Sequence, residues 1–217
     1  RPPYPAGEEF LKIQDEYLSE LIRQRGIVEA EDLPGTKASP RISLWRGDIT
    51  TLRCDAIVNA ANSALLGCWQ PCHSCIDNII HTLSGVQLRI RCNEIMEAQG
   101  HEEETGRAKI TPAYNLPCKY VLHTVGPIIS GSLRQEDCDL LAGCYRSCLE
   151  LAAEYGLRSV AFCCISTGVF CFPQQRAAKI AVETVQRFLE KGSPVEQVIF
   201  NVFTERDLKI YEELLNG

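Results

Sequence analysis

Short apolar runs alternate with longer amphipathic stretches along most of this chain, and this alternation constrains the fold more than any other feature of the sequence. Each apolar run ends in polar residues, as expected of a buried strand that feeds a loop. The stretches between the runs carry apolar residues at helical spacing. The apolar runs cover residues 42–49, 55–62, 119–125, 159–166 and 197–203, and the helical stretches cover 86–100, 137–156, 174–192 and about 205–215. This order predicts an α/β fold: a three-layer α/β/α domain around a mixed, mainly parallel central sheet.

The N-terminal region has a different pattern. Residues 8–25 form one amphipathic stretch that stops at Gly26, which predicts a helix. The next stretch, 28–41, contains Pro, Gly and Ser and predicts a linker. We therefore expect two parts: an N-terminal helical extension with its linker, residues 1–38, and one α/β domain, residues 39–217.

Charge and hydropathy argue against several function classes. The net charge is −6, and no cluster of Lys and Arg offers the phosphate contacts that nucleic-acid binding requires. No apolar run approaches the roughly 20 residues that cross a bilayer. Residues 1–10 contain no apolar core of a signal peptide. We expect a monomeric, cytoplasmic protein without nucleic-acid or membrane partners.

Cysteine is frequent, with 12 residues in 217. A disulfide framework is typical of short secreted chains, whereas these cysteines lie mostly inside apolar segments, as Cys144, Cys148 and Cys163 do. Free cysteine packs as a small hydrophobic side chain. The sequence therefore predicts reduced core thiols, except in residues 68–75, where packing does not explain the spacing.

The segment GCWQPCHSC, residues 67–75, concentrates ligands for soft metals: Cys68, Cys72, His73 and Cys75. Zinc binds thiolate and imidazole tetrahedrally; structural sites use four protein ligands, whereas catalytic sites use three and keep one position open. The sequence predicts a zinc (Zn2+) site in this loop, with either three or four protein ligands.

A second segment, STGVFCFP, lies between a predicted strand ending at Ser166 and a helix that begins near Pro173. Backbone N–H groups in such a loop, together with the positive end of the helix, can bind phosphate. Alone the signal is weak, because many strand-to-helix turns contain one glycine such as Gly168. Phe170 and Phe172 are typical packing residues.

Taken together, these motifs resemble the macrodomain family. The resemblance is carried by RGDITTLRCDAIVNAANSALLG, CIDNIIH, TGRAKITPAYNLPCKYVLHTVGP and STGVFCFP, in this order, and covers about residues 41–215. That family binds ADP-ribose and includes hydrolases that remove it from proteins. Most hydrolytic members have a glycine-rich run where this chain has GCWQPCHSC. That replacement, with the N-terminal helical extension, resembles the zinc-containing branch found in bacteria and fungi.

The resemblance implies roles for residues at the adenine and distal-ribose ends. Asp48 would accept a hydrogen bond from the adenine amino group, with Ile49 beside it; the alternative is a turn or helix cap. Asn59 and Asn62 would shape the loop and face the distal ribose, or serve only as turn formers. Asp77 would lie near the anomeric carbon, or act as N-cap of the helix that begins there.

For the rest of the ligand, the resemblance implies a diphosphate loop and an adenine-stacking aromatic. The loop comprises Ser166, Thr167, Gly168, Val169, Phe170 and Cys171. Cys171 departs from the small or polar residue usual there, although its backbone N–H can still face a phosphate. Phe203 matches the aromatic that lies against adenine, and a core phenylalanine is an equally good interpretation.

The zinc branch resembles the pattern C-x4-H-x-C, which selects Cys68, His73 and Cys75 as metal ligands and leaves Cys72 spare. A four-ligand structural site that includes Cys72 stays open. His81 and His123 are not expected to be ligands. His81 lies one helical turn after Asp77, and His123 lies inside a predicted strand, where a core histidine with satisfied hydrogen bonds is the default.

The resemblance implies a zinc-dependent hydrolase that removes mono-ADP-ribose from protein side chains, with Asn62 and Asp77 as catalytic residues and ADP-ribose bound beyond the carboxyl ends of the strands. Its partners would be ADP-ribose and mono-ADP-ribosylated proteins. Two alternatives stay open: a reader that binds ADP-ribose around a structural zinc, and a hydrolase of free ADP-ribose derivatives such as acetylated ADP-ribose.

Overall fold

A six-stranded mixed sheet forms the centre of the protein in a computed structural model that describes residues 1–217. The strands, in spatial order, are β2 (Ile42–Arg46), β8 (Gln197–Val202), β7 (Ser159–Phe162), β4 (Ala56–Ala61), β6 (Tyr120–Val125) and β5 (Ala108–Pro112). All neighbouring pairs are parallel except β5 and β6, which are antiparallel. The predicted mixed, mainly parallel sheet is therefore confirmed.

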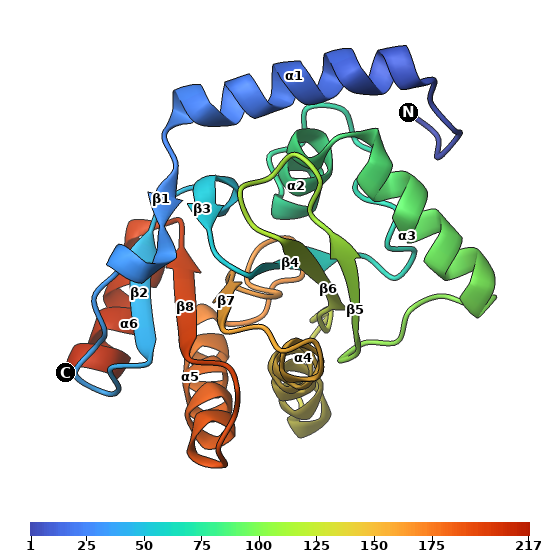
Figure 1. Ribbon diagram of the computed structural model, residues 1–217. Coiled ribbons are helices and arrows are strands. Elements are labelled where there is room, and N and C mark those ends of the chain that lie inside the picture. The colour runs from blue at the N-terminus through green and yellow to red at the C-terminus, as the bar shows by residue number, and fades with distance from the viewer.

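Helices cover both faces of this sheet (Figure 1). The helices are α1 (Glu8–Arg25), α2 (Ile76–Ser84), α3 (Val86–Gln99), α4 (Gln135–Glu154), α5 (Gln174–Glu190) and α6 (Glu205–Asn216). On one face, α2 packs on β4 and α3 on β5, while α5 packs against both α4 and α6 on the other. This is the predicted three-layer α/β/α arrangement. None of the helices is long and apolar enough to cross a membrane.

The core fills the space between the layers with the apolar strands and with cysteine. All but one residue of β4 are buried, which is the pattern of a central strand covered on both faces. All twelve cysteines are free, and seven of them are buried, including Cys92, Cys144 and Cys148. The predicted core thiols are confirmed for these residues.

The N-terminal helix α1 has the predicted bounds and ends before Gly26, whose φ of 87° suits glycine. It buries only Leu18 and Ile22, one helical turn apart. The following segment is more ordered than the predicted linker: β1 (Val28–Glu29) pairs with β3 (Leu52–Arg53), and a short 3-10 helix η1 (Ala30–Asp32) follows. The expected division at residues 38–39 stays a prediction.

One alternative and one local prediction were wrong. The helix after residues 67–75 begins at Ile76 and its N-cap is Cys75, so the alternative of Asp77 as the N-cap does not hold, and Asp77 lies in the first turn. The strand expected to end at Ser166 ends at Phe162; the chain stays buried through Ile165 but leaves the ladder, because hydrophobicity reports burial and not strand pairing.

Candidate active site

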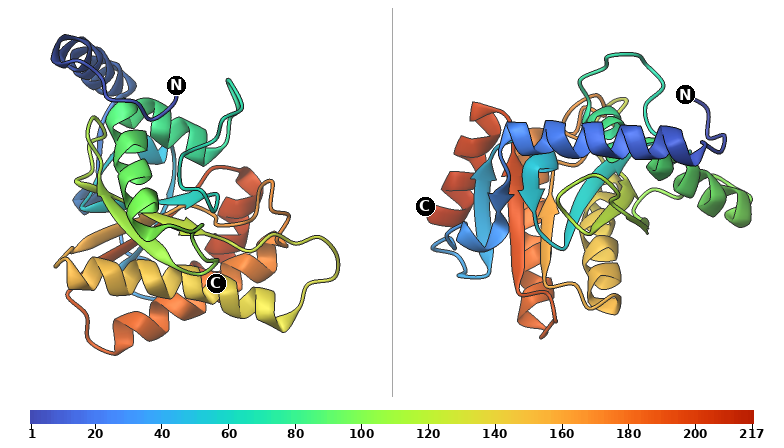
Figure 2. Two further views of the ribbon diagram at one scale, coloured as in Figure 1. Left: turned by 90° about the vertical axis from the view of Figure 1, so that its right-hand side faces the viewer. Right: turned by 45° about the horizontal axis from the view of Figure 1, so that its top comes forward.

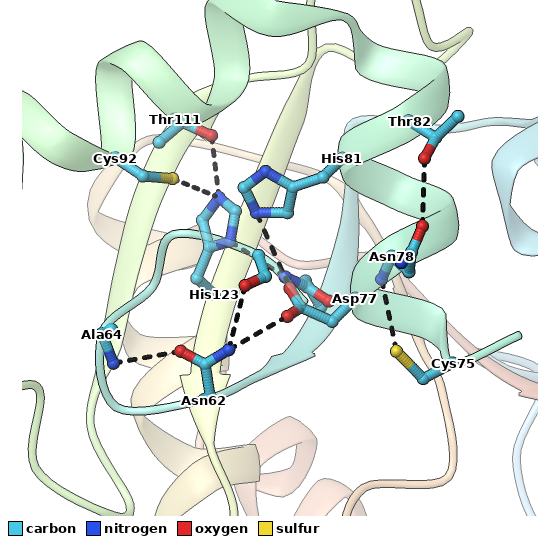
Figure 3. Close-up of polar contacts among 12 residues, drawn as sticks. Asn62, Ala64, Cys75, Asp77, Asn78, His81, Thr82, Cys92, Thr111 and His123 are labelled. Atoms are coloured by element: carbon cyan, nitrogen blue, oxygen red, sulfur yellow. Dashed lines mark hydrogen bonds and ion pairs between the residues drawn. The ribbon is translucent and has the colours of Figure 1, made fainter. Parts of the chain in front are cut away.

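A buried carboxylate, Asp77, is held by two side-chain amides (Figure 3). Asn59, inside β4, donates from Nδ2 to Asp77 Oδ1 at 2.8 Å, and Asn62, just after β4, donates from Nδ2 to Asp77 Oδ2 at 3.4 Å. Asn62 also shapes the loop, since its Oδ1 accepts from the N–H of Ala64 at 3.1 Å. The NAAN motif therefore fixes both oxygens of one carboxylate. Asn59 is fully buried, which keeps its side chain inside the protein.

Burial perturbs the acid–base chemistry of this carboxylate. Burial raises the pKa of Asp77 to about 6, while the hydrogen bond from Asn59 and the charge of Arg89 act in the opposite direction. A carboxyl group with a pKa near neutrality can accept and release a proton during a reaction. Asp77 thus has the burial and the fixed orientation expected of a reacting group.

His81 lies one helical turn after Asp77, with its Nε2 at 3.6 Å from Asp77 Oδ1. Burial lowers the pKa of His81 well below its usual value, so its ring is neutral. Neither ring nitrogen has a hydrogen-bond partner. His81 is therefore a buried, neutral histidine whose ring nitrogens are unpaired.

The metal-ligand set predicted in the loop is brought together by the fold. One ligand atom from each of Cys68, His73 and Cys75 lies within 4.8 Å of the others, and Cys68 Sγ is 3.5 Å from His73 Nδ1. Two thiols and an imidazole are the ligand chemistry that zinc prefers. Cys72 is exposed, has a φ of 57° and lies outside this group. The geometry therefore matches a three-ligand site.

Cys75 has a second contact that fixes its position. Its Sγ accepts from the N–H of Asn78 at 3.4 Å and so caps the N-terminus of α2. Burial raises the pKa of the Cys75 thiol, and the nearby Cys68 raises it further. Two neighbouring thiolates are favoured only beside a cation, which again fits a metal.

The predicted metal loop, residues 67–75, projects from the body of the protein between β4 and α2 (Figure 2). Trp69 of this loop lies under the guanidinium of Arg89 from α3, whose carbon is 4.3 Å from the ring centroid. Such a cation–π contact adds about 0.5–2 kcal/mol. The contact ties the loop to α3.

Asp48 has the capping role considered for it. Its Oδ1 accepts from the N–H of Thr50 at 3.0 Å, which caps the short helix η2 (Ile49–Thr51). Its Oδ2 faces Arg25 of α1 at 3.3 Å in a half-exposed ion pair. Oδ2 of Asp48 is therefore paired only with Arg25 of α1, outside the central domain. Ile49 is buried, so it can present only its backbone to a ligand.

The diphosphate loop has the backbone geometry expected of an anion site. Ser166 and Cys171 both have positive φ, 63° and 57°. The N–H groups of residues 168–170 donate to no protein acceptor, and a Cβ at Gly168 would meet nothing within 4 Å. The Val169 side chain is 72% exposed, whereas Phe172 is buried and anchors the loop. Successive free N–H groups of this kind form a concave anion site.

Phe203 follows β8 and is 78% exposed, so the alternative of a core phenylalanine is wrong. The neighbouring strand end carries Asp48, because the N–H of Gly47 donates to the carbonyl of Val202 at 3.3 Å. An exposed aromatic ring beside a carboxylate is a suitable surface for a flat heterocycle with an amino group.

Comparison with known proteins agrees with this arrangement. Residues 58–181 match the Macro domain family. The chain belongs to that family. It is 62% identical to a Protein-ADP-ribose hydrolase of Treponema medium, with 100% of this chain and 84% of that protein covered. It is 54% identical to a Protein-ADP-ribose hydrolase of Staphylococcus aureus strain MSSA476, with 100% and 81% covered.

The fold of this macrodomain also matches a solved structure with bound ligand. The Trypanosoma brucei macrodomain in complex with ADP-ribose superimposes with a TM-score of 0.78 at 35% identity, covering 97% of this chain and 91% of that chain. The match extends over the N-terminal helix as well as the sheet.

Sequence analysis missed Arg89 near Asp77 in this macrodomain. Arg89 gave no local signal, because its contact with Trp69 joins segments from different elements. The position of His81 one helical turn after Asp77 was predictable, because a spacing of four residues places both on one face of a helix, but no role was assigned to His81.

Proposed function

We propose that this macrodomain is a zinc-dependent hydrolase that removes mono-ADP-ribose from modified protein side chains. The relatives named Protein-ADP-ribose hydrolase, alignable over the whole chain, support hydrolysis. The ADP-ribose complex of the Trypanosoma brucei relative supports the ligand. The observation that carries the proposal is the adjacency of Cys75, one of the three ligand residues, and Asp77, the buried carboxylate, at the start of α2.

Cys68, His73 and Cys75 would hold the zinc, with Cys72 outside the ligand set. Three protein ligands leave a coordination position free for water or substrate. Zinc in such a site lowers the pKa of bound water toward 7 or polarises a substrate oxygen as a Lewis acid.

ADP-ribose would lie across the carboxyl ends of the strands. Asp48 would accept from the adenine amino group, and Phe203 would cover the adenine ring. The backbone N–H groups of residues 168–170, with the surrounding segment 166–171, would bind the diphosphate. Asn62 would contact the distal ribose, which then ends near Asp77.

Asp77 would act on the reacting sugar. Cleavage of the bond between the anomeric carbon and the protein oxygen develops positive charge on the ribose, which a carboxylate stabilises. The same carboxylate can take a proton from an attacking water. Asn59 and Asn62 hold both of its oxygens, so its orientation is set before substrate binds. The protein would work as a monomer in the cytoplasm, where its free thiols stay reduced.

The test is release of ADP-ribose from peptides that carry it on one defined side chain (Ser, Asp or Glu), with and without a chelator. Release that the chelator abolishes and added zinc restores supports the proposal. Tight binding without release would identify a reader. Release only from acetylated ADP-ribose would identify an enzyme of free nucleotides. Chelator-insensitive release from peptides would assign the zinc a structural role.

A further inference from the structure

The amide nitrogen of Asn59 is shared between two acceptors. Its Nδ2 lies 2.8 Å from Asp77 Oδ1 and 3.2 Å from His123 Nδ1. An amide nitrogen carries two hydrogens, so it can serve both if His123 Nδ1 presents a lone pair. The reverse amide orientation would put Asn59 Oδ1 against the carboxylate oxygen, which is repulsive. Asp77 therefore favours this amide orientation, which requires an unprotonated Nδ1 in His123.

His123 completes this chain of hydrogen bonds with its other nitrogen. The ring is fully buried, and burial lowers its pKa to about 4, so it carries one proton at neutral pH. With Nδ1 unprotonated, that proton is on Nε2, which donates to Thr111 Oγ1 at 3.0 Å. The Cys92 thiol lies 3.8 Å from Nε2, and a ring nitrogen of His81 lies within 4.8 Å of a His123 ring nitrogen. The Thr111 hydroxyl is thus the acceptor for this proton.

We propose that Thr111 and His123 are positioning residues of the hydrolase reaction: the Thr111 hydroxyl accepts from Nε2–H of His123 and so stabilises the tautomer whose unprotonated Nδ1 holds the Asn59 amide against Asp77. This inference rests on the proposed function. With the proton moved to Nδ1, two donors would face each other at Asn59. Asn59 and His123 are fully buried, so water does not replace the lost bond, and the amide must turn away from Asp77.

The consequence for catalysis is selective. Four side chains form this series of hydrogen bonds: Asp77, Asn59, His123 and Thr111. None of them belongs to the exposed segments that we assign to adenine and diphosphate binding. Loss of alignment should therefore lower the rate of the chemical step and leave ADP-ribose binding nearly unchanged.

The test compares Thr111→Val with Thr111→Ser. Valine keeps the volume of the buried side chain and removes the acceptor, whereas serine keeps the acceptor and removes a methyl group. Long-range 1H–15N NMR of the zinc-loaded protein identifies the tautomer of His123. We expect Nε2–H in the parent and in Thr111→Ser, and its loss in Thr111→Val. We expect kcat of Thr111→Val to fall about tenfold or more, with the ADP-ribose Kd within about threefold, and serine to restore kcat.

A parent spectrum with Nδ1–H, a parent-like kcat in Thr111→Val, or an equal loss in Thr111→Ser would overturn the proposal. If Thr111→Val does not fold, His123→Gln against His123→Leu gives the same comparison, because glutamine can accept from Asn59 and donate to Thr111. If the parent protein shows no hydrolysis, the proposed function fails, and the NMR tautomer still decides the hydrogen-bond chain separately.

Discussion

Substitution of Cys75 can distinguish the contribution of metal binding to stability from that of helix capping, because this residue has both roles. It belongs to the predicted ligand set, and its Sγ caps α2 through the N–H of Asn78. Serine is among the best N-cap residues, so Cys75→Ser keeps the cap and removes the soft ligand. Cys75→Ala removes both. Without metal, Cys75→Ser should unfold at nearly the parent temperature, and Cys75→Ala should be less stable by about 1 kcal/mol.

With zinc present, the difference should grow. Zinc at about 100 times its dissociation constant stabilises the folded protein by about 2.7 kcal/mol. For a domain of this size, 1 kcal/mol shifts Tm by about 2–4 °C, so zinc should raise the parent Tm by roughly 5–10 °C. Cys75→Ser should show none of this increase. Cys72→Ser, the matched control in the same loop, should show all of it.

The assays are scanning calorimetry at controlled free zinc and elemental analysis of protein purified without chelator. About one zinc per chain is expected in the parent and in Cys72→Ser, as for a single mononuclear site. Loss of zinc in Cys72→Ser would mean a four-ligand site. A zinc-free parent would refute the assignment of the loop.

The remaining predictions concern the carboxylates and the buried histidine. Asp48→Asn keeps the cap and replaces a carboxylate oxygen by an NH2 group, so calorimetry should show ADP-ribose binding weakened by roughly 1.5–3 kcal/mol; unchanged affinity would contradict the adenine assignment. Asp77→Asn should retain zinc and bind ADP-ribose to within about tenfold, or 1.4 kcal/mol, while turnover is lost; parent-like turnover would exclude Asp77 from the reaction. The pKa of His123 falls from 6.5 to about 4 on folding, so the unfolded chain binds more protons below pH 6.5. The free energy of unfolding should therefore decrease by up to about 3 kcal/mol as pH falls from 6.5 to 4. His123→Gln should lack this part of the slope in denaturant titrations, with His81 and Cys92 unchanged in both proteins; an identical slope would contradict the burial argument.

The sequence predicted those features that depend on local pattern and burial. The helices α1, α5 and α6 lie where periodicity placed them, because an amphipathic stripe needs only its own residues to be recognised. The strand β5 was not recognised, because AKITP is mostly half-buried and contains a proline at the edge of the sheet. The two-residue pairing of β1 with β3 was missed because it is short and depends on a distant partner.

The candidate site followed the same division. The metal ligands and the diphosphate loop were predictable, since each lies in one contiguous segment. Cys75 was not considered as the N-cap of α2, and Asp77 was the capping alternative, because capping propensity favours aspartate over cysteine. The absence of hydrogen-bond partners for the ring nitrogens of His81 was not predictable, because it depends on which residues pack around the ring in the folded protein.

The surroundings of Asp77 depend on strand register, which a sequence pattern does not specify. Parallel pairing of β4 with β6 sets Asn59 beside His123. Antiparallel pairing of β5 with β6 sets Lys109 opposite His123. Thr111, two residues along β5, is then on the same face as His123 and within reach as a diagonal neighbour. A shift of one residue in either pair would turn Asn59 or Thr111 to the other face of the sheet. The orientation of the carboxylate is therefore fixed by pairing among three strands, and a substitution that disturbs register should impair Asp77 even at a distance from the metal loop.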